Sequence, residues 1–320
     1  MLRLSASFIF CLISLPSFAN LTIGLVATRS EAETLSHWQP VLDDMEKSLG
    51  TPVKALAFNK YDDLLQAIKN GDVQIARLGS KLAMEAIENS NTEIFARLVL
   101  AGGVETYRSV LLAQKDSKFQ NLTDVLRESG RLRYAGGKAS STSGFLIPQY
   151  YAFLKNNILY EQHFKSLSVG SHQDNFLALA QKKTDIATNN TDDLAQLKKK
   201  YPKEYAQVKV IWESPPVTFD PIIQRRDLSP ELKQKIAAFF LNYGKTGGNI
   251  VEQKRKLNEA DQLDGFLPSS NAQLRPVSDL QLFHDRFRLS LNTKVSDAEK
   301  FSQEKAMYQR YEKLAKILAR

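Results

Sequence analysis

Four hydroxyl side chains stand in a row near the middle of the chain, in the stretch "ASSTSGF" at residues 139–145, and the last three of them are candidate binding residues. Ser141, Thr142 and Ser143 follow a strand-like segment, "RLRYAGG", and precede an apolar run, "FLIPQYYAFL", that is typical of a helix. The first N–H groups of a helix lack partners and carry partial positive charge, so hydroxyls and N–H groups there can converge on a tetrahedral oxyanion. Gly144 favours this interpretation, because a missing side chain lets a ligand approach the backbone. The alternative is a plain N-cap with two hydroxyls that take no part in binding.

One histidine and two aspartates are predicted to lie near these hydroxyls. His172 opens the next strand-to-helix unit, in "GSHQDNFLAL", where it could donate a hydrogen bond to an anion or cap a helix at the surface. Asp192 follows a strand, in "ATNNTDD", at the kind of edge where open α/β sheets bind ligands, although an N-cap role fits it as well. Asp220, in "VTFDPII", lies where the chain is predicted to cross between domains. Two acids beside an anion site make sense when the ligand also carries a cation.

Two tyrosines complete the candidate site, and no catalytic or metal-binding pattern accompanies it. Tyr61 and Tyr107 begin elements that face the same edge, with burial in the core as the alternative for both. The segment "SSTSG" does not match the GxSxG nucleophile elbow of hydrolases, so we assign no catalytic residue. Neither a P-loop nor a GxGxxG motif follows a predicted strand, and the histidines lack metal-ligand spacing. We therefore expect no cofactor and no metal.

The first 19 residues predict a secretory signal peptide. Arg3 precedes an apolar stretch at residues 8–15, Pro16 breaks this stretch, and the cleavage site is predicted after Ala19. A signal anchor that stays uncleaved is the alternative, but the apolar stretch is too short to span a bilayer. Cys11, the one cysteine, lies in this segment, so the mature chain would contain neither disulfides nor thiolate metal sites. We expect an exported protein of the bacterial periplasm.

The formal net charge of +8 suggests attraction to anions. Nucleic acid is not indicated, because the lysines are scattered and the densest cluster, residues 198–200, ends a predicted helix. At that position the lysines would lie in solvent and complement the helix dipole.

Strand-like and helix-like stretches alternate along the chain, which predicts an α/β fold with largely parallel sheets and helices on both faces. In residues 31–49, for example, apolar residues recur at helical spacing and Gly50 follows as a stop. The first block has predicted strands at residues 21–28, 52–58, 73–79, 93–101 and 107–114, and helices at 31–49, 61–71 and 80–90. The second has strands at 131–137, 165–169, 185–189 and 208–214 and helices at 121–128, 143–157, 172–183 and 191–202. A return strand at 220–226 and a helix at 229–246 follow.

This order of elements predicts two lobes joined by crossing segments, with a ligand in the cleft between them. The predicted first lobe is discontinuous and covers residues 20–113 and 219–290, and the second lobe covers residues 114–218. One large doubly wound sheet is the alternative. Residues 291–320 predict a helical tail with a narrow apolar seam, which would either dock on the body or pair with a second copy in a homodimer.

Several motifs resemble those of the phosphonate-binding proteins of bacterial ABC transporters. In chain order they are "VLDDMEKSLG", "KLAMEAIENSN", "STSGFLIPQYYAFLKNN", "DIATNNTDDL", "VIWESP", "DPIIQRRDLS" and "FFLNYGKT", and the resemblance covers residues 21–246. It implies the two-lobed periplasmic binding protein fold, type II-like, whose lobes close on a ligand. It also implies that the chain delivers a phosphonate or related phosphorus oxyanion to an ABC permease. Relatives of this fold also present ligands to membrane sensor kinases, which is the alternative function.

The resemblance assigns roles to the candidate residues. The oxyanion would be held by Ser141, Thr142, Ser143, His172 and Tyr61. Tyr107, Asp192 and Asp220 would line the other end, where an aminoalkyl group meets aromatic and acidic side chains.

The sequence departs from the family pattern at this second end. Arg77 and Arg108 stand where the family carries aromatic residues, and Asp192 replaces a longer glutamate. If Arg77 points into the cleft, it could bind a second acidic group of the ligand, or it could neutralise Asp220. The ligand could therefore differ from 2-aminoethylphosphonate, although the two acids favour an ammonium group.

Overall fold

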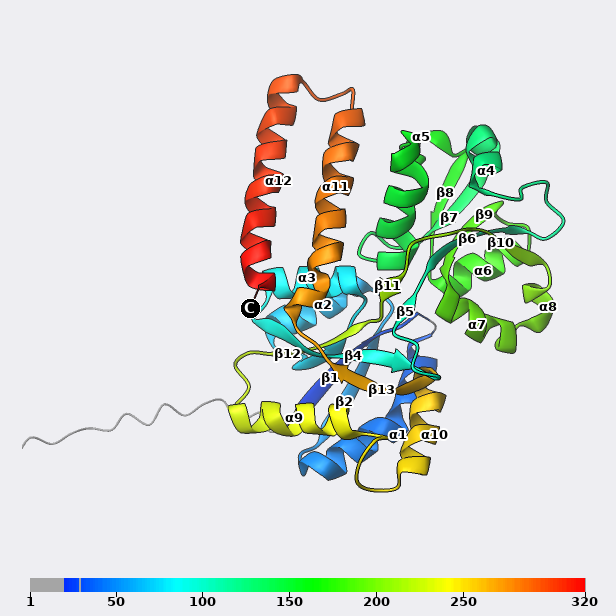
Figure 1. The fold of residues 1–320 in the computed structure, drawn as a ribbon. Helices are drawn as coiled ribbons and strands as arrows, with labels where there is room; N and C mark the ends of the chain where they lie inside the picture. Colours follow the sequence, from blue (N-terminus) through cyan, green and yellow to red (C-terminus); the bar gives the residue numbers. More distant parts are fainter. Residues whose placement is uncertain (1–19, 29, 320) are drawn as a thin grey trace, which may run out of the picture.

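Two β-sheets, one in each lobe, organise the part of the chain that the computed structural model describes, residues 20–28 and 30–319 (Figure 1). The first sheet has the order β13-β4-β12-β3-β1-β2 and contains β1 (Leu21–Val26), β2 (Val53–Phe58), β3 (Ile75–Arg77), β4 (Thr92–Leu100), β12 (Pro221–Arg225) and β13 (Leu263–Pro268). The second has the order β10-β6-β9-β7-β8 and contains β6 (Ser109–Gln114), β7 (Arg133–Gly136), β8 (Ser166–Val169), β9 (Ile186–Asn190) and β10 (Val208–Glu213). The predicted two-lobed α/β fold is confirmed. The predicted signal peptide, residues 1–19, lies outside the described residues.

Both sheets are mixed, which corrects the prediction of mostly parallel sheets. In the first sheet, β1 runs parallel to β2 and β3, as expected for strands joined by the helices α1 (Glu31–Leu49) and α2 (Tyr61–Asn70). The strand that returns from the second lobe, β12, enters between β3 and β4 and runs opposite to both. In the second sheet, β7 is parallel to β8 and β9, but β6 is antiparallel to β9 and β10.

The chain passes between the lobes on two short strands, β5 (Thr106–Tyr107) and β11 (Val217–Thr218), which pair with each other. β6 follows β5 directly and already belongs to the second sheet. The predicted lobe boundary between residues 113 and 114 is therefore too late, because it falls near the end of β6.

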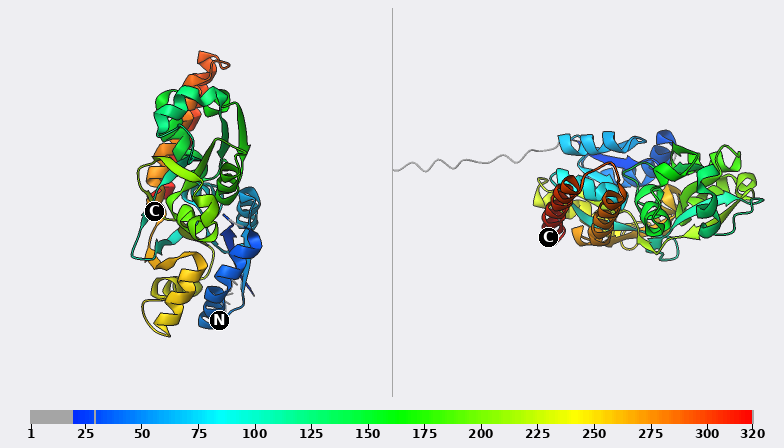
Figure 2. Two further views of the ribbon diagram at one scale, coloured as in Figure 1. Left: turned by 90° about the vertical axis from the view of Figure 1, so that its right-hand side faces the viewer. Right: turned by 90° about the horizontal axis from the view of Figure 1, so that it is seen from above.

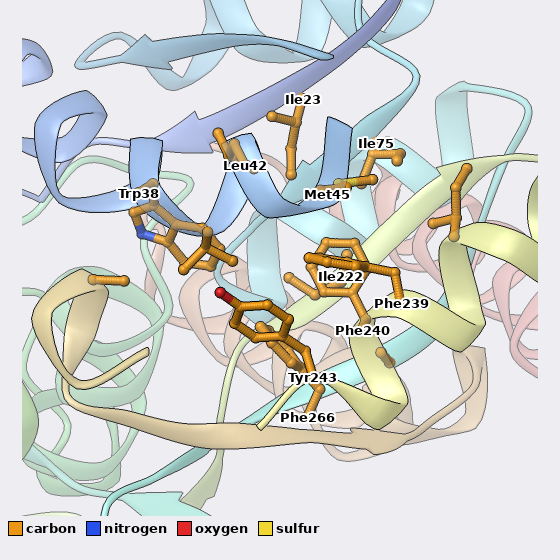
Figure 3. Close-up of a cluster of buried hydrophobic side chains, with 14 of the residues drawn as sticks. Ile23, Trp38, Leu42, Met45, Ile75, Ile222, Phe239, Phe240, Tyr243 and Phe266 are labelled. Atoms are coloured by element: carbon orange, nitrogen blue, oxygen red, sulfur yellow. The ribbon is translucent and has the colours of Figure 1, made fainter. Parts of the chain in front are cut away.

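Helix α1 shows how the sequence forms the core of the first lobe. The side chain of Ser30 caps the helix by accepting a hydrogen bond from the N–H of Glu33 at 3.2 Å, and Gly50 ends it in the left-handed conformation with φ of +64°. On its inner face, Trp38 and Met45 of α1 join an apolar cluster that also includes Phe240 and Phe266 (Figure 3). Phe240 comes from α9 (Pro230–Asn242) and Phe266 from β13, so α1 and the returning chain share one core.

The remaining helices include four that were predicted and three, at residues 160–163, 202–205 and 250–261, that were not predicted as separate helices. The first lobe also contains α3 (Ser80–Asn89) and α10 (Ile250–Asp261), and the second contains α4 (Leu122–Glu128), α5 (Tyr160–His163), α6 (His172–Ala180), α7 (Thr191–Lys200) and α8 (Pro202–Tyr205). The helix predicted after the hydroxyl cluster is wider than an α-helix, with π-helical segments at Thr142–Leu146 and Gln149–Phe153. Pro148 lies between the two segments and has no N–H to donate. Such π-turns are frequent at functional sites.

The C-terminal tail is one half of a helical hairpin. Helix α11 (Arg275–Leu291) and helix α12 (Asp297–Leu318) lie side by side beside the first lobe (Figures 1 and 2). The end of α12 docks on the body, because Leu314 and Leu318 are buried in a core cluster and Arg310 makes two hydrogen bonds to Glu88, of 2.7 and 2.6 Å. Near the start of α12, the side chain of Phe301 is 73% exposed. Throughout the described ranges, no helix combines the length and the apolar character that a membrane span requires.

Candidate ligand-binding site

A polar cavity of about 60 Å³ lies between the two lobes and brings together all nine predicted site residues. These are Tyr61, Arg77, Tyr107, Ser141, Thr142, Ser143, His172, Asp192 and Asp220. Helices α2, α3, α6 and α7 all begin at this cavity, where Tyr61, Gly79, His172 and Asn190 occupy their first or capping positions. Helix starts present free N–H groups and positive potential, so the cavity is suited to an anion.

The three hydroxyls differ in their surroundings. The side chain of Ser141 accepts a hydrogen bond from the N–H of Gly144 at 3.0 Å, so Ser141 is the N-cap of the π-helical segment. The Thr142 hydroxyl accepts a hydrogen bond from the N–H of Lys81 at 2.9 Å, which joins the second lobe to α3 of the first. The Ser143 hydroxyl lies 3.1 Å from Nε2 of His172. Thr142 and Ser143 are therefore not caps, and each can still donate its O–H into the cavity.

Gly144 serves the backbone rather than the ligand, which corrects the sequence interpretation. Its carbonyl accepts a hydrogen bond from the N–H of Gly137 at 2.8 Å. A Cβ added at Gly144 would lie 2.9 Å from the Cα of Gly137 and 2.9 Å from the hydroxyl of Ser141. The glycine pair thus lets the end of β7 and the start of the π-helical segment approach each other and places the hydroxyls at the cavity.

His172 and Asp192 do not cap their helices. Ser171 and Asn190 perform that role for α6 and α7, with hydrogen bonds from the N–H groups of Asp174 and Asp193. His172 is 8% exposed, and its Nδ1 has no hydrogen-bond partner within the described ranges. The ring is therefore held at the cavity with Nε2 toward Ser143.

The tyrosines are held neutral. Burial raises the pKa of Tyr61, and the charges of Asp193 and Asp220 act in the same direction. Burial also raises the pKa of Tyr107, whose ring lies against Phe219 with 5.2 Å between the centroids. Both hydroxyls therefore remain protonated and available as donors.

The cavity is also rich in carboxylates. Asp192, Asp193, Asp220 and Asp261 line it together with Arg77, and Asp193 Oδ2 lies 4.0 Å from Nε2 of His172. Arg77 points into the cavity, where its Nη2 lies 3.2 Å from Asp220 Oδ2 and its Nη1 lies 3.4 Å from Asp261 Oδ2. The sequence left the direction of Arg77 open, and the structure shows that it pairs with Asp220. Arg108 does not line the cavity and donates to the carbonyl of Ser214 at 2.6 Å.

Crowding of these acids changes their protonation. Burial raises the pKa of Asp192 to about 8, and the charges of Asp193 and Asp261 add to the effect. Burial also raises the pKa of Asp220, to about 6, against the opposing charge of Arg77. For Arg77, burial disfavours the charge, but Asp261 and Asp220 outweigh it and raise the pKa. Arg77 therefore stays charged, while Asp192 holds its proton at neutral pH.

Sequence reasoning missed several lining residues, among them Asn190, Asp193 and Asp261. Asp193 adjoins Asp192 in a motif that was already recognised, and its side chain accepts a hydrogen bond from Asn190 at 2.8 Å. Asp261 is the last residue of α10, where the helix dipole disfavours an acid. That mismatch was a usable signal for a residue with another role.

Side chains from the two lobes also meet around the cavity. Lys200, at the end of α7, contacts both carboxylate oxygens of Glu33 on α1 at 2.8 and 2.7 Å. Next to it, Lys199 donates to the side chain of Gln262 at 2.7 Å. These residues surround a second, wider hollow of about 440 Å³ that shares Asp193 and Asp261 with the binding cavity. The hollow adjoins the binding cavity, and the two lysines contact the first lobe beside it, so we call it the mouth of the cleft.

Comparison with known proteins identifies the family. Residues 23–274 match the sequence model of the phosphonate periplasmic substrate-binding proteins of ABC transporters. The chain belongs to this family. A phosphonates-binding periplasmic protein of Escherichia coli is 39% identical over 282 residues, which cover 88% of this chain and 82% of the relative.

Solved structures of family members agree with the fold. A binding protein component of a phosphonate ABC transporter from Pseudomonas aeruginosa superposes with a TM-score of 0.86 at 38% identity, over 94% of this chain and 98% of that one. PhnD1 from Prochlorococcus marinus, solved in complex with methylphosphonate, has a TM-score of 0.71 over 83% of this chain and 98% of that one. At 18% identity, the second comparison supports the two-lobed fold alone. Within this family fold, the described residues contain no cluster of three or more His, Cys, Asp or Glu side chains that could hold a metal ion.

Proposed function

We propose that this chain captures a small phosphonate, or a related phosphorus oxyanion, in the cleft and delivers it to an ABC permease. The observation that carries the proposal is one cavity between the lobes that combines hydroxyls, helix starts and several carboxylates. The protein would act in the periplasm, after removal of residues 1–19, by binding and release without catalysis.

The proposed oxyanion end consists of Ser141, Thr142, Ser143, His172 and Tyr61. The support is that Thr142 and Ser143 are buried hydroxyls with O–H groups available, that His172 faces Ser143, and that Tyr61 stays protonated. Neutral donors and helix starts bind an anion without the ion pairs that would make release slow.

The proposed distal end consists of Tyr107, Asp192, Asp220 and Arg77. An ammonium group there would meet carboxylates beside the ring of Tyr107. Arg77 reaches the cavity, but its charge is offset by Asp220 and Asp261. We therefore expect 2-aminoethylphosphonate to bind better than ethylphosphonate, and we expect Asp220→Asn to narrow the difference.

Isothermal titration tests this function. Hydrogen bonds to a charged ligand contribute roughly 1.5–3 kcal/mol each. Three or four of them support a micromolar dissociation constant, which corresponds to about 8 kcal/mol. The ligands to compare are 2-aminoethylphosphonate, ethylphosphonate, phosphite, phosphate and sulfate. A chain that binds none of the phosphorus oxyanions at millimolar concentration contradicts the proposal.

A further inference from the structure

Arg77 sits between two aspartates that come from different parts of the first lobe. Asp220 follows β11 and contacts Nη2, whereas Asp261 ends α10 and contacts Nη1. The side chains are largely buried, with exposed fractions of 11% for Arg77, 18% for Asp220 and 6% for Asp261. The guanidinium is thus engaged by one carboxylate on each of its two terminal nitrogens.

Asp261 is fixed independently of Arg77. Its Oδ2 accepts a hydrogen bond from Nε1 of Trp38 at 2.8 Å, and Trp38 is fully buried in the core beneath α1. The carboxylate is therefore preorganised by two helices, α1 and α10, before any ligand arrives. It occupies the place beside Nη1 that a carboxylate of a ligand would otherwise take, because guanidinium groups bind carboxylates strongly through paired N–H donors.

The charges at this end depend on Asp261. Arg77 and Asp220 alone would form a neutral pair, and Nη1 of the arginine would face the cavity. Asp261 adds a second carboxylate beside Arg77, so two carboxylates face one guanidinium, and Asp193 also lines the cavity. A ligand with a second acidic group would then meet repulsion, and a ligand with an ammonium group would meet attraction.

We infer that Asp261 is a specificity-determining residue of the cleft, which excludes phosphonates with a second acidic group by occupying Arg77. The inference rests on the proposed function, since it concerns the same site. Asp261 acts through Arg77 and so sets ligand choice rather than the strength with which the oxyanion is held.

Three phosphonates of matched length test the inference by isothermal titration. 2-Aminoethylphosphonate carries an ammonium group, phosphonoacetate carries a carboxylate, and ethylphosphonate carries neither, so it is the reference for general damage to the site. We expect Asp261→Asn, which keeps an oxygen for Trp38, to lower the affinity ratio of 2-aminoethylphosphonate to phosphonoacetate by about tenfold or more. Asp264→Asn is the matched control, because Asp264 pairs with Lys254 and does not line the cavity.

A double variant, Arg77→Gln with Asp261→Asn, separates specificity from structure. The double variant removes one positive and one negative charge. The affinity ratio of 2-aminoethylphosphonate to phosphonoacetate should therefore return to within about threefold of the wild-type ratio. A ratio unchanged by Asp261→Asn, or an equal gain in phosphonoacetate affinity in the single and double variants, overturns the inference. If the single variant fails to fold, a gain of phosphonoacetate affinity in the double variant overturns it in the same way. Failure of all three phosphonates to bind the wild type would instead reject the proposed function.

Discussion

The hydroxyls of Ser141, Thr142 and Ser143 divide three tasks among adjacent residues. Ser141 caps a helix, Thr142 links the lobes, and Ser143 faces the histidine. A sequence of three hydroxyls could not reveal this division, because each task uses the same functional group. It became visible once the hydrogen-bond partner of each hydroxyl was known.

Removing the hydroxyl of Thr142 or of Ser143 should weaken ligand binding more than folding. We expect Thr142→Val and Ser143→Ala each to weaken phosphonate binding by roughly 10- to 100-fold, since each loses a hydrogen bond to a charged group of about 1.5–3 kcal/mol. The melting temperature of the ligand-free protein should change little for Ser143→Ala, whereas Thr142→Val also removes the acceptor for the N–H of Lys81 and should lower it. Titration calorimetry and thermal unfolding measure the two effects.

The control for this prediction is Ser296→Ala, which removes the N-cap of α12 far from the cavity. That variant should lose about 1 kcal/mol of stability and keep its affinity. Cavity variants that melt lower than this control while binding normally would show that the hydroxyls are structural.

The raised pKa of Asp192 predicts a pH effect on stability. Its carboxyl holds a proton up to about pH 8 in the folded chain, whereas an unfolded aspartate releases it near pH 3.9. Over this window the folded state binds more protons than the unfolded state, so the Asp192 contribution to stability falls as pH rises. The side chain in Asp192→Asn cannot ionise. Without ligand, the melting temperature of this variant minus that of the wild type should therefore increase from pH 5.5 to pH 8.5. If this difference in melting temperature stays constant across the range, the raised pKa is contradicted.

At the scale of elements, the approach of two glycines shapes the site. Gly137 directly follows β7, Gly144 lies in the first π-helical turn, and their backbones are in contact. A side chain on either residue would push the hydroxyls away from the cavity, because backbone atoms cannot move aside as the end of a flexible side chain can.

We expect Gly144→Ala to lower both stability and affinity. The added methyl lies 2.9 Å from backbone and side-chain atoms, and overpacking of this kind costs about 1–3 kcal/mol. Gly130→Ala is the matched control, since its nearest neighbour would be 3.5 Å away. Thermal unfolding and phosphonate titration of both variants are the measurements. If Gly144→Ala behaves like the control, the glycine contact does not position the hydroxyls.

Element positions were predictable where local rules decide them. Helix α1 begins after Ser30 and ends before Gly50 because capping and the left-handed stop are local. The direction of β12 was not predictable, because it depends on where the chain returns from the other lobe. The same holds for Asp261, which reaches the cavity only because α10 packs on α1.

At the scale of the whole molecule, contacts across the mouth of the cleft favour the closed arrangement. Lys200 and Glu33 form the ion pair there, and their side chains are 40% and 22% exposed. A partly exposed pair of this kind contributes about 0.2–1 kcal/mol. The same lysine cluster was predicted to lie in solvent at the helix end, and its three members are exposed there, while two of them also contact the first lobe.

We expect Lys200→Gln to speed ligand release by up to about fivefold with little change in the association rate, because the ion pair forms only when the lobes meet. Stopped-flow fluorescence with a bound phosphonate measures both rates. Lys203→Gln is the control, since Lys203 lies on α8 and does not line the mouth. An equal effect of both substitutions would indicate general electrostatic steering.

Homodimer formation through α12 stays a prediction, and sedimentation of the full chain tests it.

The place of β12 in the first sheet has a consequence for the order of folding. Its neighbours, β3 and β4, precede the entire second lobe in the chain, whereas the five strands of the second sheet are continuous from Ser109 to Glu213. Long chain segments must be closed before β12 can pair, and closing them slows folding. The second lobe should therefore fold first. The chain holds two tryptophans, Trp38 in the first lobe and Trp212 in the second. The variant Trp38→Phe keeps only the tryptophan of the second lobe, and Trp212→Phe keeps only that of the first. During refolding, the tryptophan fluorescence of Trp38→Phe should therefore recover before that of Trp212→Phe.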